Sequence, residues 1–115
     1  MNITINVSNE LIAEVLRTAI ETASGYWVRP VEDQDAPNYS AIVAGRDYIL
    51  LDEKYGESGE RFVLNSSSVK RGLELMAQLH PYWFTNLIEA DYDITTADVL
   101  LQLSLLGKLH YDLER

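Results

Sequence analysis

Cysteine is absent from this chain of 115 residues, and its absence excludes disulfide bonds and thiolate metal sites. The lack of cysteine fits a protein of the reducing cytosol. No apolar run approaches the roughly 20 residues that span a bilayer, and the N-terminal residues lack the basic start and apolar stretch of a signal peptide. We therefore expect a cytoplasmic protein without a membrane-spanning segment.

Basic residues are few. The chain has 9 lysine and arginine residues against 18 aspartate and glutamate residues, which gives a formal net charge of −9. Such a chain repels the phosphates of nucleic acids and anionic lipid surfaces, so we expect no direct nucleic-acid or membrane partner. It attracts a basic protein surface instead, including the positive groove of a nucleic-acid-binding protein. The alternative is that the acidity serves solubility alone.

The length and the composition predict one domain over residues 1–115. The apolar share of 47% and the charged share of 23% are those of an ordinary soluble globular protein. Folding should bury roughly 65% of the surface that the unfolded chain exposes, which is enough for one core without metal or disulfide support.

The clearest element is an N-terminal helix. The alternation of residues 3–7 predicts a short strand, after which Ser8 is suited to cap a helix. From Leu11 to Ala23, apolar residues recur at helical spacing. Gly25 follows as a typical helix stop.

The middle of the chain predicts three short strands. Residues 39–43 and 48–51 favour two strands joined by a hairpin turn at residues 45–47. Residues 61–64 favour a third strand. We expect these strands to form a small antiparallel sheet.

Three helices are expected in the C-terminal half. Serines 66–68 precede the first, which stops before Pro81, and the second starts at this proline. The third is expected over residues 96–106, although the alternation of residues 101–105 leaves a strand as the alternative. The fold class is therefore α+β: one N-terminal helix, an antiparallel sheet of about three strands, then three helices.

Leucine and valine cover most sides of the last predicted helix. It is therefore either the central helix of the domain, or its excess apolar face meets another subunit. In the second case Leu101 and Leu105 would form the interface of a homodimer. Gly107 should end the helix, and residues 108–113 favour a short closing strand.

The sequence contains no recognisable catalytic or metal-binding motif. Residues 91–95 resemble the start of a calcium loop, but Thr96 and Gln102 stand where that loop needs a glycine and a glutamate. His80 and His110 do not share the spacing of helical metal ligands. The Gly-Glu-Ser-Gly stretch is neither a nucleophile elbow nor a phosphate loop. We expect no enzyme activity, no metal and no cofactor.

Candidate partner-binding residues come from the acidic loops and from one aromatic pair. Carboxylates brought together by the fold would imitate a row of phosphates, and aromatic side chains often anchor interfaces. The alternative is that the loops are scattered and solvated, and that the aromatic residues belong to the core. The candidates are Glu32, Asp33, Asp35, Asp52, Glu53, Glu57, Glu60, Tyr26 and Trp27.

Three segments follow one another in a recognisable order: GYW at residues 25–27, RGLELM at 71–76, and a tail from Thr96-Ala97-Asp98-Val99 to Tyr111. This order resembles a family of small uncharacterised proteins from bacteriophages and other bacterial mobile elements. The resemblance covers residues 3–111 and brings no catalytic residues. It implies a phage context, in which small acidic proteins such as anti-CRISPR and anti-restriction proteins bind host machinery.

The leading hypothesis is a non-enzymatic phage accessory protein in the host cytosol that binds a host protein with a basic surface. A nucleic-acid-handling defence complex is the preferred target. The second hypothesis is a homo-oligomeric structural or assembly protein of a phage, joined through the leucine-rich helix. A third, a small ligand bound between sheet and helices, has no motif to support it.

Overall fold

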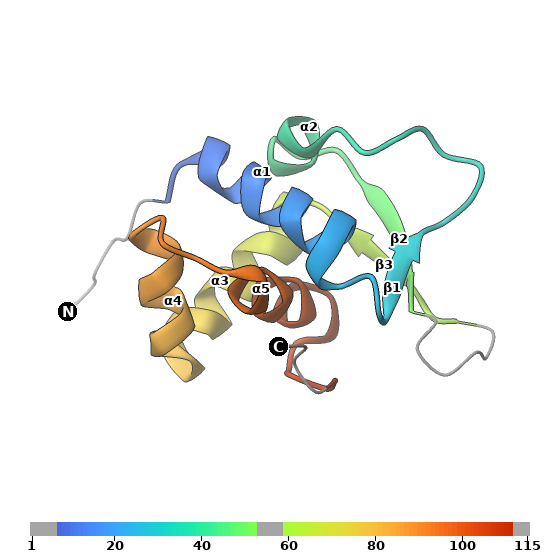
Figure 1. Cartoon of the computed structure of the whole chain (residues 1–115). Helices are drawn as coiled ribbons and strands as arrows, with labels where there is room; N and C mark the ends of the chain where they lie inside the picture. Colours follow the sequence, from blue (N-terminus) through green and yellow to red (C-terminus); the bar gives the residue numbers. More distant parts are fainter. Residues whose placement is uncertain (1–6, 53–58, 112–115) are drawn as a thin grey trace.

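The computed structural model describes residues 7–52 and 59–111. Helices and a three-stranded antiparallel sheet in the order β1-β2-β3 confirm the α+β class (Figure 1). Along the chain the elements are α1 (Asn9–Thr18), the π-helix η1 (Ala19–Ala23), β1 (Val28–Pro30), α2 (Tyr39–Val43), β2 (Tyr48–Asp52), β3 (Arg61–Leu64), α3 (Ser66–Leu79), α4 (Pro81–Ile88) and α5 (Ile94–Leu106).

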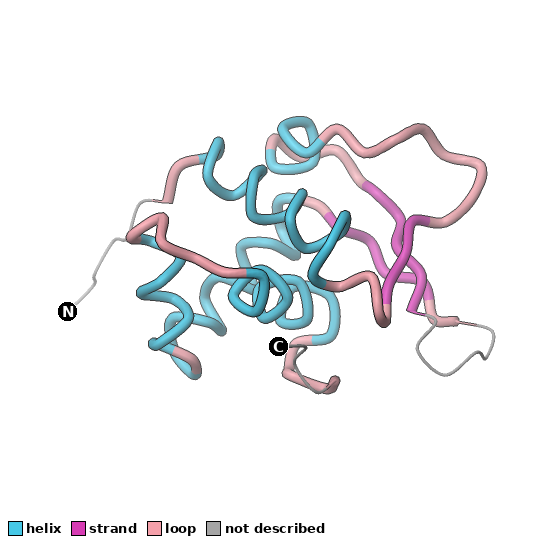
Figure 2. The backbone as a smooth tube through the Cα atoms, viewed as in Figure 1, coloured by secondary structure: helices cyan, strands magenta, loops and turns pink. Residues whose placement is uncertain are grey.

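Helix α5 is the central element of the fold. It contacts α1, η1, α3, α4 and β3, and Leu100, Leu101 and Leu103 on it are fully buried. Figure 2 shows the strands at one end of the molecule and most of the helices beside one face of the sheet. The prediction of a central helix is confirmed, and the strand alternative for residues 101–105 is wrong. A helix that is apolar on nearly every side needs neighbours all round, and here the other helices supply them.

The N-terminal helix is confirmed, but its last turn is wider than predicted. The Ser8 hydroxyl accepts a hydrogen bond from the backbone N–H of Leu11 at 3.1 Å and caps α1. In η1 the Ser24 N–H donates to the carbonyl of Ala19, five residues back, at 2.7 Å. A π-turn adds one residue to the helix, so it rotates the residues that follow. Ser24 thereby becomes fully buried.

One predicted strand is wrong. Residues 39–43 have the β-branched and aromatic content of a strand, but they form α2. The Asn38 side chain accepts from the Ala41 N–H at 3.0 Å and starts the helix, and Ile42 buries its side chain. Gly45, with φ of 126°, then leads the chain towards β2 rather than forming the predicted hairpin turn.

The sheet still has three strands because β1 replaces the predicted one. Strand β1 pairs antiparallel with β2, with Val28 opposite Asp52 and Pro30 opposite Leu50. Strand β3 pairs antiparallel with the other side of β2, as predicted. Proline has no N–H to donate, so Pro30 is compatible with an edge strand of this kind.

Each C-terminal helix begins where a capping side chain or a proline starts it. Helix α3 starts with a capping box between Asn65 and Ser68, one residue before the predicted serine run. Helix α4 begins at Pro81, as predicted. Asp93 caps α5 by accepting from the Thr96 N–H at 2.9 Å, so the helix begins at Ile94, two residues before the predicted start.

The strands predicted near the two ends of the chain are not seen in the described residues. Helix α5 ends at Gly107, whose φ of 76° is left-handed. Residues 108–111 form no strand, so the predicted closing strand is wrong over this part, and residues 112–113 lie outside the described range. Of the predicted strand at residues 3–7, only Val7 is described, and it lies in none.

Helices α3 and α5 approach closely at Gly72. A Cβ atom on Gly72 would lie 2.2 Å from the hydroxyl oxygen of Ser104 and 2.9 Å from its backbone nitrogen. Beside it, the Arg71 guanidinium donates to the Ser104 carbonyl at 2.5 Å. The absence of a side chain at Gly72 therefore sets the distance between these two helices.

Candidate functional site

The most concentrated chemistry in the molecule surrounds the carboxylate of Asp98, which is 1% exposed. Its Oδ1 atom accepts hydrogen bonds from the Ser24 hydroxyl at 2.7 Å and from the Trp27 indole N–H at 2.8 Å. Its Oδ2 atom accepts from the Tyr26 hydroxyl at 2.5 Å and from the Gln102 amide at 3.2 Å. These four donors give the buried charge the partners that it needs in a medium of low polarity.

A second set of hydrogen bonds fixes the side chain of Gln102. Its Oε1 atom accepts from the backbone N–H groups of His110 and Tyr111, at 2.9 and 3.0 Å. The amide therefore has one orientation only, with its N–H₂ group towards Asp98. The network ties the segment after α5 to the segment after η1.

Tyr111 extends this network to the sheet. Its hydroxyl donates to the carboxylate of Asp52 at the end of β2, with oxygen distances of 2.5 and 2.7 Å. Its ring lies against the indole of Trp27, with ring centroids 5.2 Å apart. Helix α5, the sheet and the C-terminal segment are thus joined by one polar and aromatic cluster, which we call the Asp98 network.

The three segments behind the phage resemblance meet on α5. The first supplies Tyr26 and Trp27 to the Asp98 network, the tail supplies Asp98, Gln102 and Tyr111, and the middle segment packs Gly72 against Ser104. The pattern therefore describes how the core is assembled. A fully bonded carboxylate is a structural group, because it has no free lone pair directed at a cavity.

The structure contradicts one candidate partner-binding residue, Trp27, and leaves two others, Tyr26 and Asp52, only partly exposed. Trp27 is 1% exposed and bonded inside the core, so it has no surface to offer a partner. Tyr26 is partly buried and donates to Asp98, and Asp52 is partly buried and accepts from Tyr111. Aromatic and carboxylate groups that satisfy each other in the interior gain more there than at a solvated surface.

The predicted homodimer interface is also inside the chain. Leu101 and Leu105 are 0% and 5% exposed. Both side chains belong to the chain's own core, so an interface between subunits through them is wrong. The helices packed around α5 already cover the apolar faces that prompted that prediction.

The acidic residues after β1 do reach the surface. Glu32, Asp33 and Asp35 are all exposed, and we call residues 32–35 the acidic loop. The fourth member, Gln34, is turned inward: its amide donates to the Ile49 carbonyl at 2.6 Å and accepts from the Ile49 N–H at 3.2 Å. This side chain pairs with β2 much as another strand residue would.

The acidic loop has a defined backbone as a result. Asp33 has φ of 71°, in the left-handed region that aspartate tolerates better than most residues. The turn at Asp33 and the two bonds of Gln34 leave three carboxylates pointing outward from four consecutive residues. No ion pair neutralises these carboxylates within residues 7–52 and 59–111.

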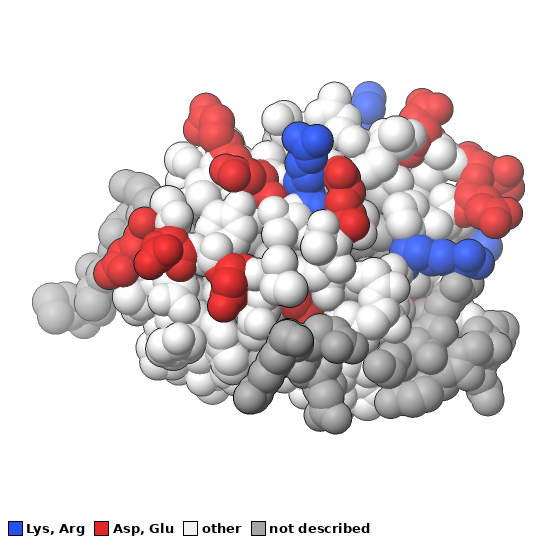
Figure 3. Space-filling view, viewed as in Figure 1, with Lys and Arg blue, Asp and Glu red and all other residues white. Residues whose placement is uncertain are grey.

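The predicted acidic residues do not form a single patch. The acidic loop follows the Pro30 end of β1, whereas Asp52 and the exposed Glu60 lie at the opposite end of the sheet. Glu53 and Glu57 lie outside the described residues. A separate acidic group on the face in Figure 3 lies over α1 and the connection from α4 to α5, where Glu10, Glu14, Glu89, Asp91 and Asp93 are exposed.

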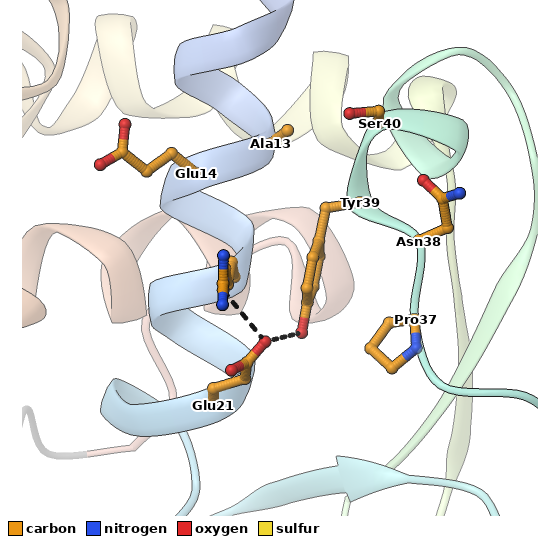
Figure 4. Close-up of a pocket in the computed structure, with 8 residues that line it drawn as sticks. Ala13, Glu14, Glu21, Pro37, Asn38, Tyr39 and Ser40 are labelled. Carbon is orange, nitrogen blue, oxygen red and sulfur yellow. Dashed lines mark hydrogen bonds and ion pairs between the residues drawn. The ribbon is translucent and has the colours of Figure 1, made fainter.

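A cleft of about 490 Å³ separates α1 and η1 from the start of α2 (Figure 4). Its floor includes Ala13, and Tyr39 forms one wall. The Glu21 carboxylate closes one end, because one of its oxygens accepts from the Tyr39 hydroxyl at 3.0 Å and lies 3.5 Å from Arg17 Nε. In Figure 4 the Glu14 carboxylate points away from Tyr39.

Tyr39 is a proton donor in this cleft. Partial burial, and then the hydrogen bond and the charge of Glu21, raise the pKa of Tyr39 well above its ordinary value. The phenol therefore stays protonated at neutral pH and cannot act there as a base.

The described residues contain neither a candidate metal site nor a membrane-spanning helix. Within the described residues, no group of three or more histidine, aspartate or glutamate side chains is placed to hold a metal ion. No helix in the same residues is long and apolar enough to cross a membrane.

Comparisons with protein-family models, with curated proteins and with solved structures found no match for this chain in any of the three. Function is therefore inferred from the geometry above. Sequence reasoning missed Gln34 and Ser24, and named Asp98 only within the tail segment of the family resemblance. Local sequence patterns do not reveal either feature. Gln34 pairs with a strand through its side chain, and Ser24 bonds to Asp98, which is more than seventy positions away.

Proposed function

We propose that this chain is a non-enzymatic accessory protein that binds a host protein through the acidic loop. The partner presents a basic surface, and a defence complex that handles nucleic acid fits this description. The observation that carries the proposal is the pair of hydrogen bonds between Gln34 and Ile49, because it holds three exposed carboxylates in one arrangement. The phage-like sequence pattern supplies the biological context.

Preorganisation is what distinguishes the acidic loop from a merely solvated one. A loop that is ordered before binding loses less conformational entropy on association, at about 0.5–1.5 kcal/mol for each side chain that would otherwise be immobilised. Three carboxylates within four residues also repel one another, and a row of arginine or lysine side chains would relieve that repulsion. Both effects favour a basic partner.

The chemistry of the Asp98 network supports a binding role over a catalytic one. Its carboxylate accepts four hydrogen bonds, and Gln102 is fixed by two backbone N–H groups. Groups so fully engaged stabilise the fold rather than exchange protons with a substrate.

Affinity capture from host lysate tests the proposal. The bait is the tagged chain, compared with two variants that replace three exposed acids by lysine and so carry the same net charge. The test variant is E32K/D33K/D35K in the acidic loop, and the control is E74K/E89K/D91K elsewhere on the surface. We expect a specific basic protein to be lost with the test variant and retained with the control.

A third variant separates preorganisation from charge. Gln34→Ala removes both bonds to Ile49 and leaves every carboxylate in place. We expect its affinity for the captured partner to fall by about tenfold, mainly through faster dissociation. Capture that is lost equally with the test and control variants would show that net charge alone recruits the partner. Capture of no specific protein would refute the proposal.

A further inference from the structure

A second pocket, of about 310 Å³, lies between the acidic loop and α2. The side chains that line it come from the connection between β1 and α2, from α2 itself and from the turn into β2. Figure 1 shows this connection arching from β1 to α2. Ligand sites in proteins occupy about 300–1,000 Å³, so this volume suits a small molecule.

Two opposite charges line this pocket without neutralising each other. The Asp35 carboxylate and the Arg46 guanidinium are both exposed and both belong to its lining. Neither group makes an ion pair, with the other or with any further residue of the described part of the chain. The pocket therefore presents one negative and one positive group whose charges are available to a bound molecule.

Tyr48 adds an uncharged group of the same kind. Its side chain lines the pocket and is only 6% exposed. Its hydroxyl makes no hydrogen bond within residues 7–52 and 59–111. The oxygen is not sealed in the core, because in those residues only the Ser104 hydroxyl is both fully enclosed and without a partner. A phenolic hydroxyl donates and accepts, so a molecule in the pocket can satisfy a group that the fold leaves unsatisfied.

The walls of the pocket are fixed before anything binds. On one side the two hydrogen bonds of Gln34 to Ile49 hold the acidic loop. On the other side the Asp47 carboxylate, a second acid in the lining, accepts from the Asn65 amide at 2.9 Å. Groups held in this way lose little conformational freedom when a ligand arrives.

We propose that this pocket binds an α-amino acid in its zwitterionic form. The ammonium group of the amino acid pairs with Asp35 and Asp47, and its carboxylate pairs with Arg46 and accepts from the Tyr48 hydroxyl. Arg46 repels a ligand that is only a cation, and the two carboxylates repel one that is only an anion. A ligand with both charges is attracted by all three groups.

Amino-acid binding does not rest on the proposed function, although Asp35 belongs to the acidic loop. Glu32 and Asp33 are not part of the pocket lining. The variant E32K/D33K should therefore weaken capture of a host protein and change the affinity for an amino acid by less than about twofold. The two proposals can thus fail separately.

Titration of the isotope-labelled chain with each common L-α-amino acid, up to about 10 mM, tests the proposal. We expect at least one of them to shift the amide signals of Asp35, Arg46 and Tyr48. The best-bound amino acid is then compared with its carboxamide, which lacks the negative charge, and with its deaminated acid, which lacks the positive charge. Each should bind at least about tenfold more weakly than the amino acid.

Variants of the lining identify the groups that bind. Asp35→Asn and Arg46→Gln should each lower the affinity at least about tenfold, whereas Glu74→Gln, an exposed acid outside the pocket, should not change it. Tyr48→Phe should lower the affinity by about threefold to tenfold without loss of stability, because its hydroxyl has no partner in the described fold. The proposal is overturned if no amino acid shifts these signals. It is also overturned if the carboxamide or the deaminated acid binds as tightly, or if the pocket variants bind as the wild type does.

Discussion

Replacing Asp98 tests the central claim about the core, that one carboxylate joins three parts of the chain. Asp98→Ala removes the partner of the Ser24 hydroxyl and of the Trp27 indole N–H, neither of which donates to another acceptor among the described residues. Gln102 retains its contact with the Tyr111 carbonyl at 3.3 Å. Each buried donor left without an acceptor costs about 1–3 kcal/mol. Two such donors predict that Asp98→Ala lowers the free energy of unfolding by about 2–6 kcal/mol.

Asp98→Asn should lower the free energy of unfolding less than Asp98→Ala does, because most of the hydrogen bonds can still form. The asparagine oxygen can still accept from Ser24 and Trp27, and the Tyr26 hydroxyl can turn to accept from the new amide. Gln102 cannot turn, because its oxygen is held by two backbone N–H groups. Two amide N–H₂ groups then face each other at the former 3.2 Å contact. One lost bond predicts a cost of about 1–2 kcal/mol.

Urea denaturation followed by circular dichroism measures both costs, with Trp27→Phe as a partner for a double-mutant cycle. Trp27→Phe removes one donor to Asp98, so its cost in the Asp98→Ala background should be smaller than in the wild type. Since a domain of this kind has a total stability of about 5–15 kcal/mol, Asp98→Ala approaches the limit of folding. Equal costs below about 1 kcal/mol for the alanine and asparagine variants would refute the anchoring role.

Three further substitutions have defined outcomes. Gly72→Ala should lower the free energy of unfolding in urea by about 1–3 kcal/mol, because its Cβ would meet Ser104 at 2.2 Å. Adding Ser104→Ala should recover only part of this cost, since the backbone nitrogen at 2.9 Å remains. Ser104→Ala alone should raise stability by about 0.5–1 kcal/mol, because the buried hydroxyl has no hydrogen-bond partner among the described residues. A lower free energy of unfolding for Ser104→Ala would contradict this explanation. Tyr39→Phe should reduce the loss of stability above about pH 10: the raised pKa of Tyr39 keeps its proton in the folded state while the unfolded state ionises, so stability falls as pH rises. Thermal unfolding from about pH 8 to about pH 11 measures the slope. Burial also raises the pKa of Tyr48, so some slope should remain, but an unchanged slope would refute the role of Tyr39.

Local signals predicted much of the secondary structure. Ser8, Pro81 and Gly107 mark helix ends because capping, ring closure and left-handed φ act within a few residues. The same kind of reasoning failed at residues 39–43. Their strand-like content is a weak preference, and the Asn38 cap together with the burial of Ile42 outweighs it.

The candidate surface was predicted less well than the fold. The acidity of residues 32–35 is evident from composition, but the inward turn of Gln34 depends on a strand that is distant in sequence. Trp27 has the chemistry of an interface anchor and is nevertheless buried. An isolated segment does not reveal which of its side chains meets a carboxylate from another helix.

By itself the sequence determined the charge, the lack of thiol chemistry and the helix ends at Ser8, Pro81 and Gly107, because these follow from residue types and from interactions between near neighbours. Only the tertiary structure decided that Asp98 is the centre of the core, that Leu101 and Leu105 are internal, and that the acidic loop stands apart from Asp52. Those outcomes depend on contacts between residues far apart in the chain. They form when burial of the apolar faces brings the elements together and the polar groups inside must then find partners.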